Sequence, residues 1–300
     1  MINQLKLDNF SRNYLVISSD MHQRYTTMIE KISKFLNIPI ENILNNPDIK
    51  YISLPIIDKG GKYVESVSNN DLLLNHYGLI DKIDSNRIGN EISIEQIREV
   101  ISFTQISAHK NKKIVILNDA AKLNKEASSA LLKTLEEVSS NCSFIILCNS
   151  HTDVYETIRS RCQLIYLDTT KKLNSYSNFA EYFYSNNEFL KSYSDEYNIN
   201  NTIENTTSEI EGLLSKTADP IETSAKWHKV GTKLIVEVLH NYIVFIVRNS
   251  ISLNFQENNH NKNLKKLSDI YNKIPFIKKN ISLNINHKYI LNNISIELAS

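Results

Sequence analysis

The first half of the chain alternates short apolar runs with amphipathic stretches, a pattern typical of a sheet with crossover helices. Continuous apolar runs predict buried strands, because a parallel strand covered on both faces has no polar side. The five predicted strands are residues 14–17, 51–54, 114–117, 144–147 and 164–167. Apolar residues at helical spacing predict the helices between them, at residues 22–36, 94–103, 125–138 and 153–159.

After Asp168 the pattern changes to helices separated by polar segments rich in Asn, Ser and Thr, notably residues 198–208. Helical periodicity predicts one long helix over residues 225–248 and a last helix over residues 284–298. No further strand is predicted. The fold class is therefore α/β plus all-α, with a doubly wound parallel five-stranded sheet followed by a helical region.

Composition limits the functional classes. The chain has 300 residues, enough for two or three domains, and its 34 Lys and Arg nearly balance 33 Asp and Glu. Because the long-range field is weak, charge alone does not predict nucleic-acid binding. Three cysteines without metal-ligand spacing (Cys142, Cys148 and Cys162) predict a reducing cytoplasm and no zinc. The longest strongly apolar run, residues 242–247, is far too short for a membrane span.

A nucleotide-binding loop is missing. Such a loop needs glycines around the phosphates, a lysine, and a Ser or Thr for magnesium. The pair Gly61-Lys62 does not qualify, since Tyr63 follows it. The segment between the first strand and helix has Ser19 and Arg24 where glycines would stand, Tyr25 where the lysine would stand, and then Thr26. Bulk and missing glycines therefore argue against a bound phosphate.

Two motifs carry a family resemblance. The run at residues 130–137 reads Ala-Leu-Leu-Lys-Thr-Leu-Glu-Glu, and Ser160, Arg161 and Cys162 follow after the next strand. Together they resemble the ATPase core of the AAA+ clamp loaders. With the missing loop, the chain resembles the delta-prime subunits of the bacterial DNA polymerase III clamp loader, over residues 46–168.

The resemblance implies three domains. These are an AAA+ nucleotide-binding-like domain with a degenerate site at residues 1–168, a helical lid at 169–204, and a helical collar for oligomerisation at 205–300. Asn118 and Asp119 stand where the family holds magnesium and polarises water, but Asn118 is neutral and Asp119 is shorter than Glu. A simple strand-to-loop turn explains those two residues better.

The intact Ser160-Arg161-Cys162 motif implies that Arg161 is an arginine finger, supplied in trans to ATP on a neighbouring subunit, with Ser160 and Cys162 supporting it. Arg159 either points elsewhere or shares that role, and the plain alternative for Arg161 is a surface arginine. Cys162 is expected to fill the core rather than act as a nucleophile. Asn149 stands at a sensor position, where a strand-end cap is the simpler interpretation.

The expected function is that of a non-hydrolysing subunit of a hetero-pentamer with tau/gamma and delta subunits, helping to load the sliding clamp on primed DNA. No intrinsic catalysis, cofactor, metal or membrane contact is expected in this chain, and the clamp and primer-template DNA are further candidate partners. Two alternatives stay open: an active AAA+ ATPase with an atypical phosphate loop, or a purely structural adaptor of the replisome.

Overall fold

A computed structural model describes residues 10, 12–109, 112–137, 141–167, 176–252, 258–282 and 286–300. The chain forms two compact units, one of residues 1–73 with 81–172 and the other of residues 74–80 with 173–300. Helix α2 (Asn69–Tyr77) carries the chain from the first unit into the second. Each unit has its own hydrophobic core.

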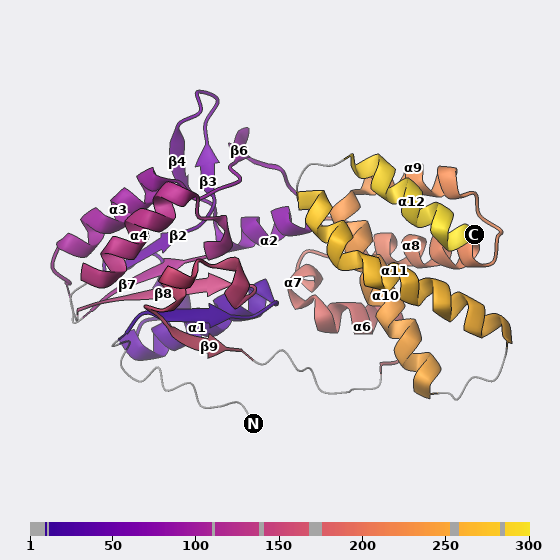
Figure 1. The fold of residues 1–300 in the computed structure, drawn as a ribbon, viewed down its shortest axis with the longest axis horizontal. Coiled ribbons are helices and arrows are strands. Elements are labelled where there is room, and N and C mark those ends of the chain that lie inside the picture. The colour runs from indigo at the N-terminus through magenta and orange to yellow at the C-terminus, as the bar shows by residue number, and fades with distance from the viewer. Residues whose placement is uncertain are drawn as a thin grey trace. The chain divides into compact units, whose positions relative to one another are not determined.

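The first unit is built on a five-stranded parallel sheet in the order β2–β7–β8–β1–β9. The strands are β1 (Tyr14–Ile17), β2 (Ile49–Ile52), β7 (Lys113–Leu117), β8 (Cys142–Cys148) and β9 (Gln163–Tyr166). Alternate residues of one strand enter different cores: Leu15 packs with helices α3 (Ile94–Gln105) and α4 (Lys125–Glu137), and Val16 packs with α1 (Met21–Leu36) on the opposite face (Figure 1). This arrangement confirms the predicted doubly wound α/β fold.

A second, antiparallel sheet in the first unit was not predicted. Its order is β4–β3–β6–β5, formed by β3 (Pro55–Ile57), β4 (Tyr63–Ser66), β5 (Lys82–Ile83) and β6 (Asn86–Ile88). Gly61 and Lys62 lie in the turn between β3 and β4, where Gly61 has φ 84° and the Lys62 amide donates to Asp58 Oδ1 over 2.8 Å. The Gly-Lys pair therefore closes a hairpin.

Two predicted elements of the first unit are displaced or shortened. Strand β2 pairs from Ile49 to Ile52 with β7, two residues before the predicted position. The predicted helix at residues 153–159 is wrong in its first half, because Val154 and Tyr155 are extended and separate the 3-10 turn η3 (His151–Asp153) from helix α5 (Glu156–Arg159). Two further 3-10 turns are η1 (Ile40–Asn42) and η2 (Ala120–Lys122).

All the regular secondary structure in the described residues of the second unit is helical. Its helices are α6 (Phe179–Asn186), α7 (Glu188–Lys191), α8 (Ile199–Leu214), α9 (Pro220–Val230), α10 (Thr232–Ser252), α11 (Asn258–Ser282) and α12 (His287–Ala299). Helix α10 packs against α6, α8 and α11, and α12 packs along α9. Trp227, Leu239 and Leu291 are among the buried side chains of this core.

Two predictions for the helical region are wrong. Residues 199–208 belong to α8, whose buried stripe includes Ile203, Thr206 and Ile210, so the polar segment is a helix. The long helix at 225–248 is two helices bent by 116° at Gly231, which has φ 124°. The predicted boundary between lid and collar, at residue 204, lies inside α8. The predicted end of the first domain at residue 168 lies outside the described residues, and so does the predicted helix start at residue 284.

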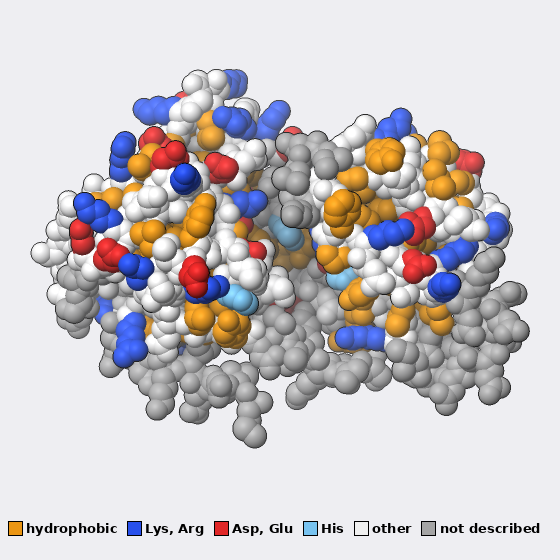
Figure 2. Space-filling model, viewed as in Figure 1, with side chains coloured by type: hydrophobic (Ala, Val, Ile, Leu, Met, Phe, Trp, Pro, Cys, Tyr) orange, Lys and Arg blue, Asp and Glu red, His pale blue; other side chains and the backbone are white. Residues whose placement is uncertain are grey.

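The surface carries charges of both signs. On the face shown in Figure 2, Lys and Arg side chains are intermixed with Asp and Glu, as the totals of 34 and 33 lead one to expect. Within the described residues, no single helix is both long and apolar enough to cross a membrane, and only the bent pair of α9 and α10 reaches that length and composition together.

Candidate functional site

The carboxyl ends of strands β1, β7 and β8 lie side by side in the sheet and carry polar residues. Ser18 follows β1, Asn118 follows β7, and Asn149 follows β8. Ligands of open α/β sheets bind at this edge. The helix that follows β1, α1, supplies Arg24 to the same place, so these four residues are the natural centre of any nucleotide site in this unit.

Arg24 lies fully buried at that edge. Its Nη1 donates to the Ser18 carbonyl oxygen over 2.9 Å and also to Asn149 Oδ1. Its Nε and Nη2 have no partner among the described residues. Burial lowers the pKa of Arg24, and the charge of Asp119 opposes this shift more than any other neighbour does. Arg24 is therefore an internal cation that ties α1 to the ends of β1 and β8.

Asn118 and Asp119 differ from each other in role. Asn118 is fully buried, and its Nδ2 donates to Tyr51 Oη over 3.1 Å and to Asn69 Oδ1 over 3.0 Å, so it joins β7 to β2 and to α2. It is thus more than the turn residue that the sequence suggested. Asp119 does turn the chain, with φ 65°, and burial raises the pKa of its carboxyl while Arg24 lowers it.

The other residues between β1 and α1 that the sequence singled out are directed into the protein's own structure or into solvent. Ser19 is exposed. Tyr25 packs edge-on against Tyr51, with ring centroids 6.0 Å apart, and burial raises its pKa to about 12. The Thr26 hydroxyl donates to the His22 carbonyl oxygen of its own helix over 2.9 Å.

These residues fit a nucleotide phosphate poorly. Arg24, the buried cation at this edge, donates its hydrogen bonds to Ser18 and Asn149, and the Thr26 hydroxyl, which would face magnesium, is bonded within α1. The segment from Ser18 to Thr26 contains no glycine whose backbone could wrap a phosphate. Across the described parts of the chain, no three His, Cys, Asp or Glu residues gather closely enough to hold a metal ion.

Arg161 lies at the surface just after α5, held by bonds to two helices. Its Nε donates to Glu136 Oε1 of α4 over 2.7 Å, and its Nη2 also pairs with that oxygen. Its Nη1 donates to the Thr157 carbonyl oxygen over 2.8 Å and to Ser160 Oγ over 3.2 Å. The side chains of Arg161 and Glu136 are 36% and 50% exposed, so the guanidinium is oriented yet open to solvent.

The neighbours of Arg161 in the motif have structural roles. Ser160 Oγ donates to the Thr157 carbonyl oxygen over 3.0 Å and accepts from Arg161. Cys162 packs against the first unit's core, and burial raises the pKa of its thiol to about 12, so it is protonated at neutral pH. Arg159 pairs with Glu156 within α5 over 3.3 Å, whereas Arg161 pairs with Glu136 of α4.

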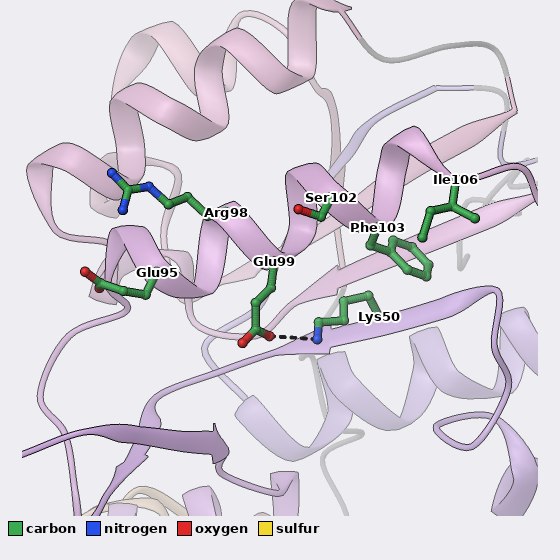
Figure 3. Close-up of a pocket in the computed structure, with 7 residues that line it drawn as sticks. All are labelled: Lys50, Glu95, Arg98, Glu99, Ser102, Phe103 and Ile106. Atoms are coloured by element: carbon green, nitrogen blue, oxygen red, sulfur yellow. Dashed lines mark hydrogen bonds and ion pairs between the residues drawn. The ribbon is translucent and has the colours of Figure 1, made fainter.

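Two surface hollows lie in the first unit. One, of about 470 Å³, lies beside the Ser160-Arg161-Cys162 motif and is lined by Arg12, Asn13, Ser160, Arg161, Cys162 and Gln163. The other, of about 490 Å³, lies along α3 and β2 (Figure 3), where Lys50 and Glu99 point toward each other and pair over 2.8 Å. The second hollow contains none of the residues predicted from sequence, and its lysine is already neutralised.

Sequence reasoning missed the partners of both arginines. Arg24 was predicted to stand at a glycine position, but its bond to Asn149 joins residues 125 positions apart. Arg161 was predicted as the finger, but its pairing with Glu136 joins residues 25 positions apart. No spacing rule reports such contacts, although Glu136 lies in the same motif that carries the resemblance.

Comparison with known proteins supports the resemblance over part of the chain. Residues 44–171 match the family model of the DNA polymerase III delta subunit. The DNA polymerase III subunit delta' of Haemophilus influenzae is 36% identical over 77 residues, which are 25% of this chain and 24% of that protein. Replication factor C subunit 3 of Arabidopsis thaliana is 45% identical over 53 residues, 18% of this chain and 15% of that protein.

Among solved structures, a DNA polymerase III gamma subunit-related protein from Thermotoga maritima covers 96% of this chain and 94% of its own, at 15% identity and a TM-score of 0.48. The matched segments of the two sequence relatives cover only 15% to 24% of their lengths. The family-model match at residues 44–171 spans less than half of the chain but includes the motif-bearing part of the parallel sheet, so over this part the chain is similar to clamp-loader proteins.

Proposed function

We propose that this chain is a non-hydrolysing subunit of a DNA polymerase III clamp loader, which lends Arg161 to the ATP site of a neighbouring subunit during loading of the sliding clamp. The observation that carries the proposal is the contrast between two arginines. Arg24 is fully buried at the chain's own strand ends, whereas Arg161 is held at the surface. One arginine closes a site and the other is available to a partner.

The chain's own strand ends argue against hydrolysis here. A hydrolysing site needs phosphate donors, a metal-binding carboxylate and a group that orients water. At the corresponding positions Arg24 is bonded to the protein, Asn118 is neutral and bonded to Tyr51 and Asn69, and Asp119 turns the chain. These residues support a subunit that depends on its neighbour's nucleotide, and they disfavour the alternative of an active ATPase.

The surface around Arg161 supports contact with a neighbour. Strand β9 is an edge of the sheet, and Leu164 and Tyr166 on one of its sides are 40% and 61% exposed. Tyr155, which precedes α5, is 55% exposed. Aromatic side chains and arginine are enriched in protein interfaces. An exposed apolar edge beside an oriented guanidinium is what an interface carrying an arginine finger requires.

The chemistry of the proposed role follows from the guanidinium. Arginine is planar, permanently charged at neutral pH, and able to donate two parallel hydrogen bonds to phosphoryl oxygens. As the phosphoryl group transfers, charge spreads over its oxygens, and a cation placed there stabilises the transition state. Such fingers accelerate hydrolysis by roughly 10³- to 10⁵-fold.

The proposed partners are the tau/gamma and delta subunits, in a hetero-pentamer, with the sliding clamp and primer-template DNA as further candidates. In this proposal residues 169–204 serve as a lid and residues 205–300 as a collar that joins the subunits. The helical second unit, with its own core, is compatible with an oligomerisation role. A structural adaptor is the competing proposal, in which Arg161 has no phosphoryl partner.

The first prediction tests Arg161 in the reconstituted complex. Arg161→Ala should lower ATP turnover at the neighbouring site by roughly 10³- to 10⁵-fold, because the transition state loses its cation. Arg161→Lys should not restore it, since an ammonium cannot donate the same pair of bonds. Steady-state ATP hydrolysis by the assembled complex measures both.

The matched control is Arg159→Ala, which removes an arginine two residues earlier that pairs within α5. It should leave turnover unchanged, and size-exclusion chromatography should show that all three variants assemble. Normal turnover by an assembled Arg161→Ala complex would reject the finger role and favour the structural adaptor.

A further inference from the structure

The guanidinium of Arg161 is held on both sides by this chain. On one edge of the guanidinium, Nε and Nη2 both donate to Glu136 Oε1. On the other, Nη1 donates to the Thr157 carbonyl oxygen and to the Ser160 hydroxyl. Among the described residues, Nη2 donates only to Glu136, so its second N–H is left for another acceptor. The side chain is therefore fixed in direction by four hydrogen bonds, while it stays 36% exposed.

The end of helix α4 provides the charge that holds Arg161. Glu136 and Glu137 lie in its last turn, and no basic residue of that turn offsets them. Carboxylates near the negative end of a helix dipole are unfavourable on their own, and a nearby cation relieves this. Arg161, from the segment after α5, is the cation that pairs with Glu136.

We propose that Glu136 is a positioning residue for Arg161, which holds the finger in the direction needed to meet a phosphoryl group on the neighbouring subunit. The inference rests on the proposed function of Arg161. Glu136 itself does not touch the nucleotide in this proposal. It acts by fixing the rotamers of the long arginine side chain before the subunits meet.

The benefit of this pairing is in orientation rather than in folding. An exposed ion pair contributes little to stability, because solvent screens it and two flexible side chains must be ordered. A free arginine side chain on the surface samples many rotamers, and catalysis requires it to be placed closely against the reacting group. Ordering it in advance should raise turnover by roughly three- to tenfold, because Glu136 removes part of the rotamer freedom of the arginine side chain before the subunits meet.

The experiment compares three variants in the reconstituted complex with its ATPase partners. Glu136→Ala removes both hydrogen bonds and the charge, whereas Glu136→Gln keeps an oxygen that can accept from Nε. Glu137→Ala is the matched control, since it removes the adjacent exposed carboxylate of the same helix turn. ATP hydrolysis is measured over a range of ATP concentrations, and thermal melting of each isolated chain is recorded.

We expect Glu136→Ala to lower kcat by roughly three- to tenfold, with KM for ATP unchanged because the nucleotide binds in the neighbour's site. Glu136→Gln should retain most of the wild-type kcat, and Glu137→Ala all of it. Melting temperatures should stay close to that of the wild type. A purely structural role of Glu136 would instead lower the melting temperature and would show no recovery in the glutamine variant.

Three results would overturn the inference: an unchanged kcat in Glu136→Ala, a raised kcat, which would mean that Glu136 restrains the finger, or a glutamine variant as slow as the alanine one. Arg161→Ala in the same assay separates the two proposals. If Arg161→Ala is slow and Glu136→Ala is normal, only the positioning role fails. If Arg161→Ala is normal, the finger role fails and the positioning role with it.

Discussion

At the residue scale, the most unusual side chain is Arg24. A fully buried arginine is rare unless it is paired and hydrogen-bonded, because removing its charge from water is costly. Here one terminal nitrogen is bonded to Ser18 and Asn149, and the surrounding carboxylates that favour its charge are Asp119, Asp20 and Asp153. Arg24 thus balances a cluster of acidic groups at the strand ends.

We predict that Arg24→Met lowers the free energy of unfolding by about 3 kcal/mol at pH 7, because the acidic groups then lose their buried counter-charge. Urea unfolding followed by circular dichroism measures the loss. Arg12→Met is the control, since Arg12 is exposed and should change stability by no more than about 0.5 kcal/mol. Equal losses in both variants would contradict the role given to Arg24.

The same variant should show a defined pH dependence. The pKa of the Asp119 carboxyl in the folded protein is raised by burial and lowered by Arg24, so it rises further when Arg24 is replaced. A carboxyl whose pKa is higher in the folded than in the unfolded protein destabilises the fold at pH values above its folded pKa. This loss of stability disappears below the ordinary pKa of 3.8, where the carboxyl is protonated in both states. The deficit of Arg24→Met should therefore shrink as the pH falls from 7 toward that value.

The sequence singled out Arg161 and Arg24, but it did not predict the contacts that these two side chains make. The sequence placed Arg161 as the finger candidate and Arg24 at the degenerate loop because both follow from motif order along the chain. The bonds of Arg24 to Asn149 and of Arg161 to Glu136 depend on how β8 and α4 pack in space. A pattern read along one chain has no access to that information.

At the element scale, the sequence predicted the elements with strong hydrophobic periodicity and did not predict the short ones. Strands β1, β7 and β8 are buried on both faces, so their apolar runs stand out, whereas the edge strands β2 and β9 are partly exposed. The strands of the second sheet have two to four residues, too few to show alternation. Gly231 was overlooked because apolar positions continue on both sides of it.

We predict that Gly231→Ala destabilises the second unit by about 1–3 kcal/mol, since its φ of 124° is a conformation that residues with a Cβ rarely adopt. A Cβ there would meet only the Gly78 carbonyl oxygen at 3.8 Å, so strain rather than crowding is the cause. Thermal unfolding measures the change. Val230→Ala, at an exposed neighbouring position, should have little effect, and an equal loss would contradict the strain argument.

At the scale of the whole molecule, two units with separate cores divide the chain, and the family match at residues 44–171 lies in the first unit except for residues 74–80. The second unit was predicted as helical, but its helix boundaries were predicted poorly because its polar faces resemble loops in composition. The near balance of charge, with 34 basic and 33 acidic residues, gives the chain no strong general attraction to nucleic acid.

We predict that the intact isolated chain does not bind ATP with a Kd below about 1 mM, corresponding to roughly 4 kcal/mol of binding free energy. The reason is that Arg24, Asn118 and Thr26 are each bonded within the protein. Equilibrium dialysis with labelled ATP measures this, with a tau/gamma subunit as the positive control. Clear binding would instead favour the active-ATPase alternative.

The buried position of Arg24 has a consequence for cell physiology. In a subunit that binds ATP, the nucleotide dissociates from the strand ends when the supply of ATP falls. The Arg24 guanidinium belongs to the polypeptide and cannot dissociate. The edge of the sheet that Arg24 ties together should therefore keep one arrangement in starved and in growing cells alike, whatever the ratio of ATP to ADP.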